Sequence, residues 1–256
     1  MNATEEDTAN TVIWHDVECG SYAEDLPLWE RLADTAPPLS GAADVLDLGA
    51  GTGRVATHLA RRGHRVWALD HDEVLVDVLR ARAEAEEAGV TGAVADARNF
   101  SLPNRFGLIC APMQLAHLFT GDERSSMLAS VASHLEPGGI AAFALMAAMP
   151  EPWRAGRDGD APAPDVGERD AWVFSSLPVA VEADPGVGIV VHRLRQTVSP
   201  EGALSEEEHV FRLAELSAGR LEQEAAAAGL RPRERHEVAE TDDFVGSTVV
   251  VVEAPE

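Results

Sequence analysis

The sequence predicts a doubly wound α/β fold with a mostly parallel sheet. From Asp44 to Met149, short apolar runs bounded by Gly or Pro alternate with amphipathic stretches of helical period. The first apolar run ends in three alternating glycines, Gly49, Gly51 and Gly53. Strands of a parallel sheet are covered by crossover helices on both faces, so they read as continuous apolar runs separated by helices.

Five runs in this part are expected to be strands, and three of the stretches between them are expected to be helices. The helical stretches are RVATHLARRG, VLVDVLRARAEAEEAG and DERSSMLASVASHLEPGG. The strand runs are VLDLG, RVWALD, GAVADA, FGLICAP and GIAAFAL. Each helix joins two parallel strands, so the crossovers should be right-handed.

The N-terminal part is expected to form a helical cover. Residues 1–10 are acidic and polar, and we expect them to be a disordered arm. Residues 11–40 carry apolar positions at helical spacing before Pro37-Pro38, which predicts one or two short helices. The apolar positions that define the pattern are Leu26, Leu28, Trp29 and Leu32.

A different pattern begins after Met149. Residues 150–169 are rich in Pro, Gly and Asp and predict a loop. Residues 170–214 contain short strand-like runs separated by the turn sequences ADPG and SPEG. Tight turns of this kind join antiparallel strands, so we expect a small antiparallel sheet here.

The chain closes with a helix and two strands. The helix SAGRLEQEAAAAG should end at Gly229, a residue type that commonly terminates helices. RPRERHEV and STVVVVEA follow as the last strands. Residues 150–214 are therefore expected to interrupt an α/β domain formed by residues 41–149 and 215–256.

The composition disfavours several classes of function. The formal net charge is −24 at pH 7, and all 20 basic residues are Arg. So acidic a chain repels the phosphate backbone, which disfavours a nucleic-acid partner. The absence of Lys excludes Schiff-base chemistry on a protein lysine. The two cysteines, Cys19 and Cys110, are far apart, which disfavours a disulfide framework or a zinc site.

The sequence also gives an expectation about location. The N-terminus MNATEEDTAN lacks the basic start and apolar middle of a signal peptide. The longest apolar stretch, Gly139–Met149, is too short to cross a bilayer. We therefore expect a cytoplasmic protein with no membrane partner.

The spacing of the glycine loop limits its ligand. Dinucleotide-binding loops follow G-x-G-x-x-G, which after Gly49 and Gly51 would need a glycine at the position of Arg54. The observed pattern is D-x-G-x-G-x-G, from Asp47 to Gly53. A nucleotide-like ligand at the carboxyl ends of the strands remains expected, because ligands of open α/β sheets bind there.

This spacing resembles the first motif of class I S-adenosylmethionine-dependent methyltransferases of the small-molecule type, and the resemblance extends over residues 44–145. It implies a seven-stranded Rossmann-like sheet with an antiparallel last strand, and S-adenosylmethionine (SAM) as the cofactor. In this family the glycine loop packs against the methionine part of the cofactor, an acidic residue ending the second strand bonds the ribose hydroxyls, and the next residue lies along the adenine. The matching residues here are Asp47, Gly49, Ala50, Gly51 and Gly53 for the loop, Asp70 for the ribose and His71 for the adenine.

The resemblance continues at the next two strand ends. An acidic residue after the third strand takes the adenine amino group, which matches Asp96 with Ala97 beside the ring. The segment after the fourth strand passes under the sulfonium, and the turn LEPGG precedes the fifth strand as in the family. The matching residues after the fourth strand are Ala111, Pro112, Met113 and Gln114.

The departures from the family are informative too. The fourth strand begins at Gly107 where an Asp is frequent, and it ends in CAPM instead of Asn-Pro-Pro-aromatic. The second departure disfavours methylation of adenine or amide amino groups. The Asp that begins the magnesium site of catechol-type members would fall near Ala111, so we expect a metal-independent reaction.

The acceptor is expected to contact the cover and the inserted strands. Tyr22, the only tyrosine, is the candidate to close over the cofactor, as an aromatic residue does in small-molecule members. Strand alternation places Arg193 and Arg195 on one face and His192 on the other, and a cationic pair facing the acceptor would suit a carboxylate or phenolate. His15 and His117 are further possible bases. Other polar or aromatic residues of the insertion are Trp172, His209 and Arg212.

The leading hypothesis is a metal-independent methyltransferase that moves the methyl of SAM to an O or N atom of a small molecule. No catalytic residue is assigned, and either a monomer or a homodimer is compatible with the sequence. A non-catalytic SAM-binding or interaction protein on the same fold is the alternative. A nicotinamide-dependent oxidoreductase is disfavoured by Arg54.

Overall fold

The structure is a computed structural model that describes residues 5–36, 45–241 and 244–256. Pro37-Pro38 lie outside the described residues. The chain forms two compact units. Unit 1 consists of Met1–Tyr22, Ala148–Glu215 and Glu240–Val245, and unit 2 of Ala23–Ala147, Leu216–Ala239 and Gly246–Glu256.

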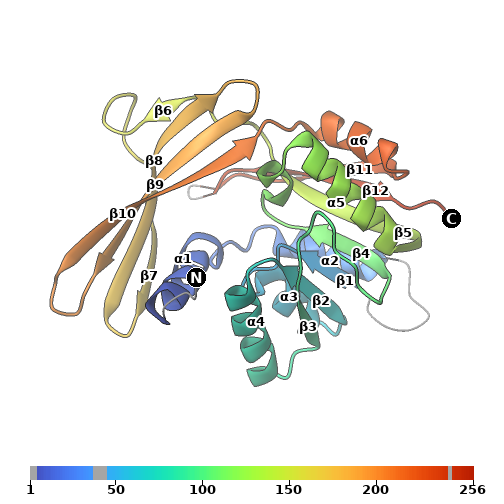
Figure 1. Ribbon diagram of the computed structural model, residues 1–256, viewed down its shortest axis with the longest axis horizontal. Helices are drawn as coiled ribbons and strands as arrows, with labels where there is room; N and C mark the ends of the chain where they lie inside the picture. The colour runs from blue at the N-terminus through green and yellow to red at the C-terminus, as the bar shows by residue number, and fades with distance from the viewer. Residues whose placement is uncertain (1–4, 37–44, 242–243) are drawn as a thin grey trace. The chain divides into compact units, whose positions relative to one another are not determined.

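Unit 2 is built on a seven-stranded sheet with the strand order β11-β12-β5-β4-β1-β2-β3 (Figure 1). The strands β1 to β5 are parallel, whereas β12 is antiparallel to both of its neighbours. This confirms the predicted mostly parallel sheet with an antiparallel last strand. The strands are β1 (Val45–Leu48), β2 (Val66–Asp70), β3 (Val90–Val94), β4 (Phe106–Ala111), β5 (Leu135–Met146), β11 (Arg231–Val238) and β12 (Ser247–Glu253).

Helices cover both faces of this sheet. The sheet grows outward from β1 in two directions, and right-handed crossovers therefore place the helices of the two halves on opposite faces. α2 and α3 pack together, and α5 packs against α6 (Figure 1). The helices are α2 (Leu26–Thr35), α3 (Arg54–Ala60), α4 (Glu73–Ala85), the short 3-10 helix η1 (Leu115–Leu118), α5 (Gly121–His134) and α6 (Ala218–Ala227).

Local sequence explains where these helices begin. The Asp72 side chain accepts the backbone N–H groups of Val74 and Leu75 at the start of α4. Thr120 and Glu123 form a capping box at the start of α5. Such caps satisfy N–H groups that have no partner within the helix. α4 thus starts directly after the end of β2, whereas the segment with η1 separates α5 from the end of β4.

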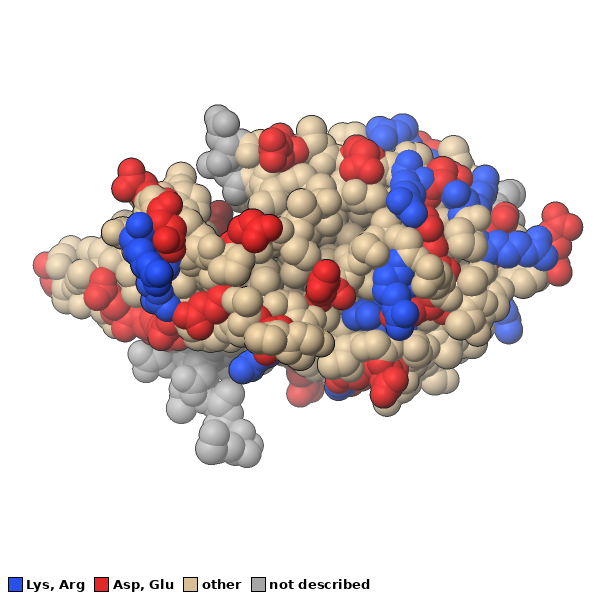
Figure 2. All heavy atoms as spheres, turned by 90° about the horizontal axis from the view of Figure 1, so that it is seen from above, with Lys and Arg blue, Asp and Glu red and all other residues tan. Residues whose placement is uncertain are grey.

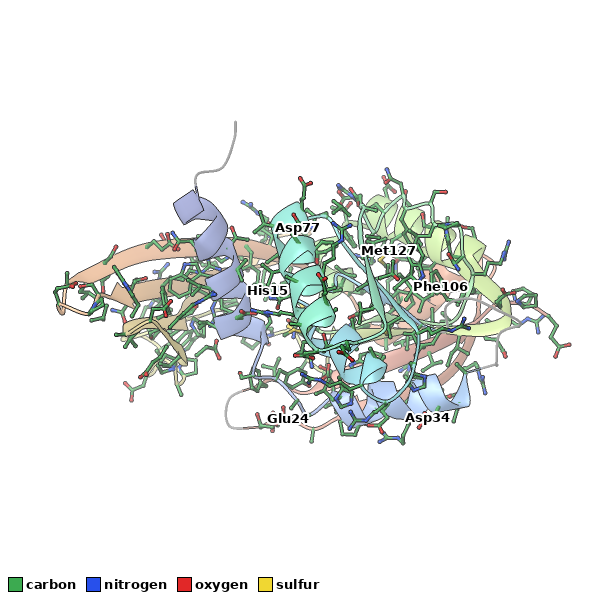
Figure 3. All side chains as sticks on the ribbon, turned by 90° about the horizontal axis from the view of Figure 1, so that it is seen from below. His15, Glu24, Asp34, Asp77, Phe106 and Met127 are labelled. Atoms are coloured by element: carbon green, nitrogen blue, oxygen red, sulfur yellow. The ribbon has the colours of Figure 1, made fainter. Side chains whose placement is uncertain are left out.

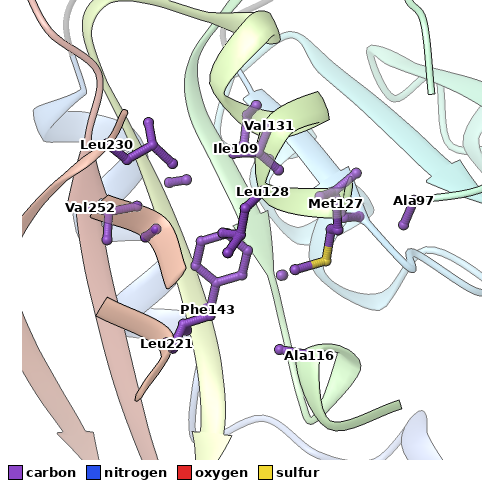
Figure 4. Packing of buried hydrophobic residues seen from close by; sticks show 14 of the residues in the cluster. Ala97, Ile109, Ala116, Met127, Leu128, Val131, Phe143, Leu221, Leu230 and Val252 are labelled. Atoms are coloured by element: carbon purple, nitrogen blue, oxygen red, sulfur yellow. The ribbon is translucent and has the colours of Figure 1, made fainter. Parts of the chain in front are cut away.

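The core of unit 2 lies between the sheet and its helices. Phe143 of β5 packs with Leu128 of α5 and Leu221 of α6, and each is at most 1% exposed (Figure 4). All six residues of β4 are buried, as expected for a central parallel strand covered on both faces. At roughly 25 cal/mol per Å² of apolar surface, this burial is the main stabilising contribution to the unit.

Unit 1 contains an antiparallel sheet with the order β10-β9-β8-β6, in which β7 also pairs with β8. The pairing confirms the predicted antiparallel strands after residue 170. Residues 150–169, predicted to be a loop, instead contribute two short strands, because β8 extends far enough to pair with both. The strands are β6 (Trp153–Arg154), β7 (Asp165–Arg169), β8 (Trp172–Asp184), β9 (Gly188–Val198) and β10 (Leu204–Ala214).

One helix, α1 (Glu5–Cys19), packs on this antiparallel sheet. Trp14 of α1 meets Phe174 of β8 edge to face, with ring centroids 5.6 Å apart. α1 begins at Glu5, inside the range expected to be a disordered arm, and α2 is part of unit 2, although both helices were expected in one cover. The helix therefore begins within the polar stretch Glu5–Asn10, ahead of its first large apolar residue, Val12.

The described surface matches the composition. Figure 2 shows acidic side chains spread over the visible face with Arg side chains among them. In the ranges 5–36, 45–241 and 244–256, no helix has the length and apolar character needed to cross a membrane.

Candidate functional site

The carboxyl ends of the parallel strands of unit 2 gather the residues predicted for a ligand site. Asp47 of β1 is in register with Ala68 of β2 and Cys110 of β4, and Asp70 of β2 is in register with Val94 of β3. The loops that follow these strands therefore leave the sheet at one edge. The structure brings together the glycine loop, Asp70, His71, Asp96, Ala97 and the end of β4.

The glycine loop between β1 and α3 needs its glycines for conformation and for space. Gly49, Gly51 and Gly53 all have positive φ, at 67°, 54° and 95°. A Cβ on Gly49 would lie 2.9 Å from Cδ1 of Leu115 in η1. Residues with a side chain rarely adopt a positive φ, and a side chain at position 49 would also collide with Leu115. Both the backbone conformation and the space therefore require glycine at this position. The loop is also tied to β2, since the N–H groups of Gly49 and Ala50 both donate to the Leu69 carbonyl.

Asp70 is held by the backbone on both of its carboxylate oxygens. Oδ2 accepts the Gly51 N–H at 2.9 Å, and Oδ1 accepts the Asp72 N–H at 3.0 Å. The side chain is 8% exposed. A carboxylate oxygen can accept two hydrogen bonds. Oδ2 therefore retains one acceptor position, whereas Nδ1 of the exposed His71 side chain lies 3.2 Å from Oδ1 and would have to turn away to leave a position there. A carboxylate fixed in this way matches a vicinal diol such as a ribose.

Asp47 lies beneath the loop and is 1% exposed. Its Oδ2 accepts the Ala56 N–H of α3 at 3.0 Å. Burial raises the pKa of the Asp47 carboxyl to about 7, against the opposing effects of Arg54 and of the Ala56 hydrogen bond. Burial and the Asp47 charge likewise raise the pKa of the neighbouring Cys110 thiol. Asp47 therefore braces the start of α3, at an electrostatic cost in its ionised form.

This cost predicts a pH-dependent effect of Asp47→Asn. The folded pKa is raised above the unfolded value, so the folded protein holds an extra proton between about pH 4 and pH 7 and loses stability as the pH rises through that range. Asparagine can still accept the Ala56 N–H but never ionises. The unfolding free energy of the variant minus that of wild type should therefore be about 1–3 kcal/mol larger at pH 8 than at pH 5. Urea unfolding at both pH values measures this, and an equal difference at the two pH values would contradict it.

Asp96 follows β3 and is bound by the side chain of Arg98. Both carboxylate oxygens accept from Arg98, whose Nη1 also lies 2.6 Å from Oε1 of Glu123. The Arg98 hydrogen bonds lower the pKa of Asp96 to about 2. Asp96 therefore stays ionised, with Arg98 contacting both of its oxygens and its side chain 34% exposed. Ala97 is buried and the His71 side chain is 84% exposed.

The segment after β4 has an unusual backbone. Met113 has a φ of 55°, in the left-handed region that non-glycine residues rarely occupy. It is half-buried, as is Gln114, whereas Ala111 and Pro112 are buried. Such a strained conformation persists only where the surrounding structure holds it in place, and conformations of this kind are concentrated at ligand sites.

Tyr22 belongs to unit 1, and its expected role of closing over a cofactor remains a prediction. It is 5% exposed and its ring packs against Phe244, with centroids 4.8 Å apart. The packing within unit 1 thus gives Tyr22 a fixed position.

The expected cationic pair on β9 is not available to an acceptor. Arg195 donates to both carboxylate oxygens of Glu18 on α1, at 2.8 and 2.9 Å. Arg193 pairs with Asp165 and donates to the hydroxyl of Ser176. The predicted alternation is correct, but these guanidiniums face α1 and are neutralised there. Their role is to attach α1 to the sheet.

The three candidate bases also have structural surroundings. His117 in η1 is buried, and its Nε2 accepts the Met146 N–H at 3.2 Å. Nδ1 of His192 lies 2.7 Å from a Glu208 carboxylate oxygen. His15 lies half-buried on α1 (Figure 3). Of the other insertion residues, Trp172 is exposed on β8, while His209 and Arg212 lie on the edge strand β10.

Sequence reasoning missed an ion pair beside the glycine loop. Arg54, the first residue of α3, makes a bidentate pair with Asp25, which immediately precedes α2. In the sequence, Arg54 is notable only as the residue that breaks the dinucleotide pattern. The available signal was an arginine at a helix start, where the helix dipole disfavours a cation.

The described residues show no group of three or more His, Cys, Asp or Glu side chains that could hold a metal ion. The arrangement therefore offers backbone N–H groups, two carboxylates and apolar loop surfaces. These features suit an organic ligand with a diol and an amino group.

Comparison with known proteins agrees with this geometry. Residues 45–139 match the methyltransferase domain family. A cypemycin N-terminal methyltransferase from a Streptomyces species is 35% identical over 123 residues, which are 47% of this chain and 48% of that protein. The chain thus matches about half the length of this curated relative.

Solved structures share the fold at low sequence identity. The sugar N-methyltransferase KedS8 of Streptoalloteichus sp ATCC 53650 aligns with a TM-score of 0.71 at 19% identity, covering 100% of this chain and 94% of that one. SAM-bound CalS10, an amino pentose methyltransferase of Micromonospora echinaspora, aligns with a TM-score of 0.67 at 20% identity, covering 99% and 98%. These likenesses show the fold.

Proposed function

We propose that the chain transfers the methyl group of SAM to an amine nitrogen of a small molecule or short peptide, as a class I SAM-dependent methyltransferase. The match of residues 45–139 to the methyltransferase domain family supports this proposal. The observation that supports this most strongly is the Asp70 carboxylate at the end of β2, whose two oxygens are each fixed by one backbone N–H group.

The residues at the strand ends fit this cofactor. Asp70 would accept the two ribose hydroxyls. Asp96, ionised over the whole physiological pH range, would accept the adenine amino group on Oδ2 in place of the longer of its two Arg98 contacts there, Nε at 3.0 Å. His71 and Ala97 would flank the adenine. The glycine loop would contact the methionine part, together with the segment after β4. The residues we assign to the loop and this segment are Asp47, Gly49, Ala50, Gly51, Gly53, Ala111, Pro112, Met113 and Gln114.

The cofactor supplies an activated methyl group on a positively charged sulfur. The chain's own contribution is to hold the cofactor and acceptor in line and to exclude water, which is the main requirement of such a displacement. The buried loop residues provide the fixed surface for this, and Tyr22 is our candidate to close over the cofactor. The site needs no base if the acceptor amine binds with its lone pair free.

An amine acceptor is favoured over a hydroxyl by two considerations. The named relative is a cypemycin N-terminal methyltransferase, and the named structural neighbours are a sugar N-methyltransferase and an amino pentose methyltransferase. The net charge of −24 also raises the local concentration of cationic amines and repels acids. Since Arg193 and Arg195 are neutralised, a carboxylate or phenolate acceptor loses the support it had from the sequence.

Transfer of a labelled methyl group tests this proposal. The chain is incubated with methyl-labelled SAM and a panel of amino sugars, peptides with free N-termini, phenols and carboxylic acids. We expect labelled product from amines only, with yield rising with pH as the ammonium fraction falls. Labelling of phenols would overturn the choice of nitrogen. Tight cofactor binding with no product from any acceptor would favour a non-catalytic SAM-binding protein.

A further inference from the structure

The most unusual feature of unit 2 outside the proposed ligand contacts is the Asp25–Arg54 ion pair. Nη1 of Arg54 lies 2.5 Å from Oδ1 of Asp25, and Nη2 lies 2.9 Å from Oδ2. The side chains are 11% and 3% exposed. Asp25 Oδ2 also accepts the indole N–H of Trp29 at 2.8 Å, and Trp29 is fully buried. The hydrogen-bond partners of this carboxylate, Arg54 and Trp29, thus both have side chains that are buried or nearly so.

Stability alone does not explain such a pair. Removing two charges from water costs about as much as their attraction returns, so a buried ion pair contributes little net stability compared with apolar residues of the same size. What a bidentate pair does supply is a defined relative position of two backbone segments. Here the segments are the start of α2 and the start of α3, helices that pack against each other.

The start of α3 is also the end of the glycine loop. Gly53, with its φ of 95°, directly precedes Arg54, and the Gly51 N–H two residues earlier is bonded to Asp70. A Cβ on Gly53 would lie 2.9 Å from the Leu79 side chain of α4, so the loop end has no room to shift toward α4. The ion pair therefore holds the loop end from the α2 side, and Leu79 limits it from the α4 side.

We propose that Arg54 and Asp25 are positioning residues of the cofactor site, which act by fixing the glycine loop against α2. The inference rests on the proposed cofactor, because the loop position matters through the ligand that it holds. Neither side chain needs to touch the cofactor for this role.

The chain offers a matched control for a test. Glu224 of α6 makes a bidentate pair with Arg124 of α5, at 2.8 and 3.1 Å, with side chains 8% and 5% exposed. Asp25→Asn and Glu224→Gln each remove the charge of one buried carboxylate in unit 2 without changing its size. Both variants should lose stability in urea, but only one of the two pairs adjoins the glycine loop.

The measurement is the dissociation constant of S-adenosylhomocysteine by calorimetry, on variants shown by circular dichroism to be folded. Asp25→Asn should raise Kd about tenfold and Glu224→Gln less than about twofold. The double variant Asp25→Asn with Arg54→Met should bind no more weakly than the weaker single variant, since the two residues act as one unit. Arg54→Lys keeps the positive charge but cannot form the bidentate hydrogen bonds of a guanidinium, and it should raise Kd about threefold. This variant replaces Asp25→Asn in the test if Asp25→Asn does not fold.

Amide hydrogen exchange gives a readout independent of ligand binding. Without ligand, exchange at residues 50–56 should be faster in Asp25→Asn than in wild type and unchanged in Glu224→Gln. Equal Kd values for Asp25→Asn and wild type, or an equal loss in both carboxylate variants, would overturn the positioning role while leaving the cofactor assignment intact. Failure of wild type to bind S-adenosylhomocysteine would overturn the cofactor assignment and this inference together.

Discussion

Asp70→Ala is expected to weaken S-adenosylhomocysteine binding by about 1–3 kcal/mol, which corresponds to roughly 5- to 150-fold in Kd. Asp70 is the only residue to which we assign two cofactor hydrogen bonds, and its carboxylate also fixes the Gly51 N–H. Alanine removes all of these contacts at once. Calorimetric titration of the folded variant measures the loss.

Two further variants show whether this loss comes from the diol contact. Asp77→Ala removes an exposed carboxylate on α4 of the same unit (Figure 3) and should leave Kd unchanged. Asp70→Asn keeps the size of the side chain but places an N–H donor where an acceptor is needed, so it should bind nearly as weakly as alanine. Unchanged affinity in Asp70→Ala would mean that the ligand is not bound at the end of β2.

The largest effect on stability is expected for Glu18→Ala in unit 1. Glu18 accepts from Arg195 and from Ser176, and its side chain is 15% exposed. Removing one partner of a mostly buried pair leaves uncompensated charge, which costs about 3–5 kcal/mol when burial is complete. Because some water reaches this cluster, we expect about 2–4 kcal/mol. Urea unfolding at pH 7 measures it.

The pH dependence of this effect has a definite sign. Burial alone would raise the pKa of Glu18, but hydrogen bonds from Arg195 and Ser176 outweigh it and lower the pKa. The stabilisation is therefore complete above the unfolded pKa of about 4.3 and is lost as the pH falls through the lower folded pKa. The loss of unfolding free energy in Glu18→Ala, relative to wild type, should therefore become smaller in acid. As a control, Glu208→Gln changes an exposed position on β10. It should change the unfolding free energy by less than about 0.5 kcal/mol, both at pH 7 and in acid. A similar loss in both variants would contradict the account.

The elements of unit 2 could be predicted because each depends on neighbouring residues. Buried parallel strands read as apolar runs, Asp72 and Thr120 mark helix starts, and the positive φ of Gly49 follows from the turn that the motif requires. The convergence of Asp70 and the glycine loop was equally predictable, since parallel strands end at one edge. These features follow from local chemistry and sheet geometry.

Contacts between distant residues could not be predicted in the same way. The faces of β9 followed from alternation, but the partner of Arg195 is Glu18, 177 residues away. The sequence therefore presented a free cationic pair where the structure has a neutral cluster. The same limit concealed the Asp25–Arg54 pair, and it left the strands β6 and β7 unrecognised because their pairing depends on β8.

The central claim is that the glycine loop and Asp70 bind SAM rather than a dinucleotide. Calorimetric titration of the purified chain with S-adenosylhomocysteine and, separately, with NADH tests it most directly. The account predicts saturable binding of one S-adenosylhomocysteine per chain and no heat of binding from NADH at the same concentrations. Binding of NADH in preference to S-adenosylhomocysteine, or binding of neither, would contradict it.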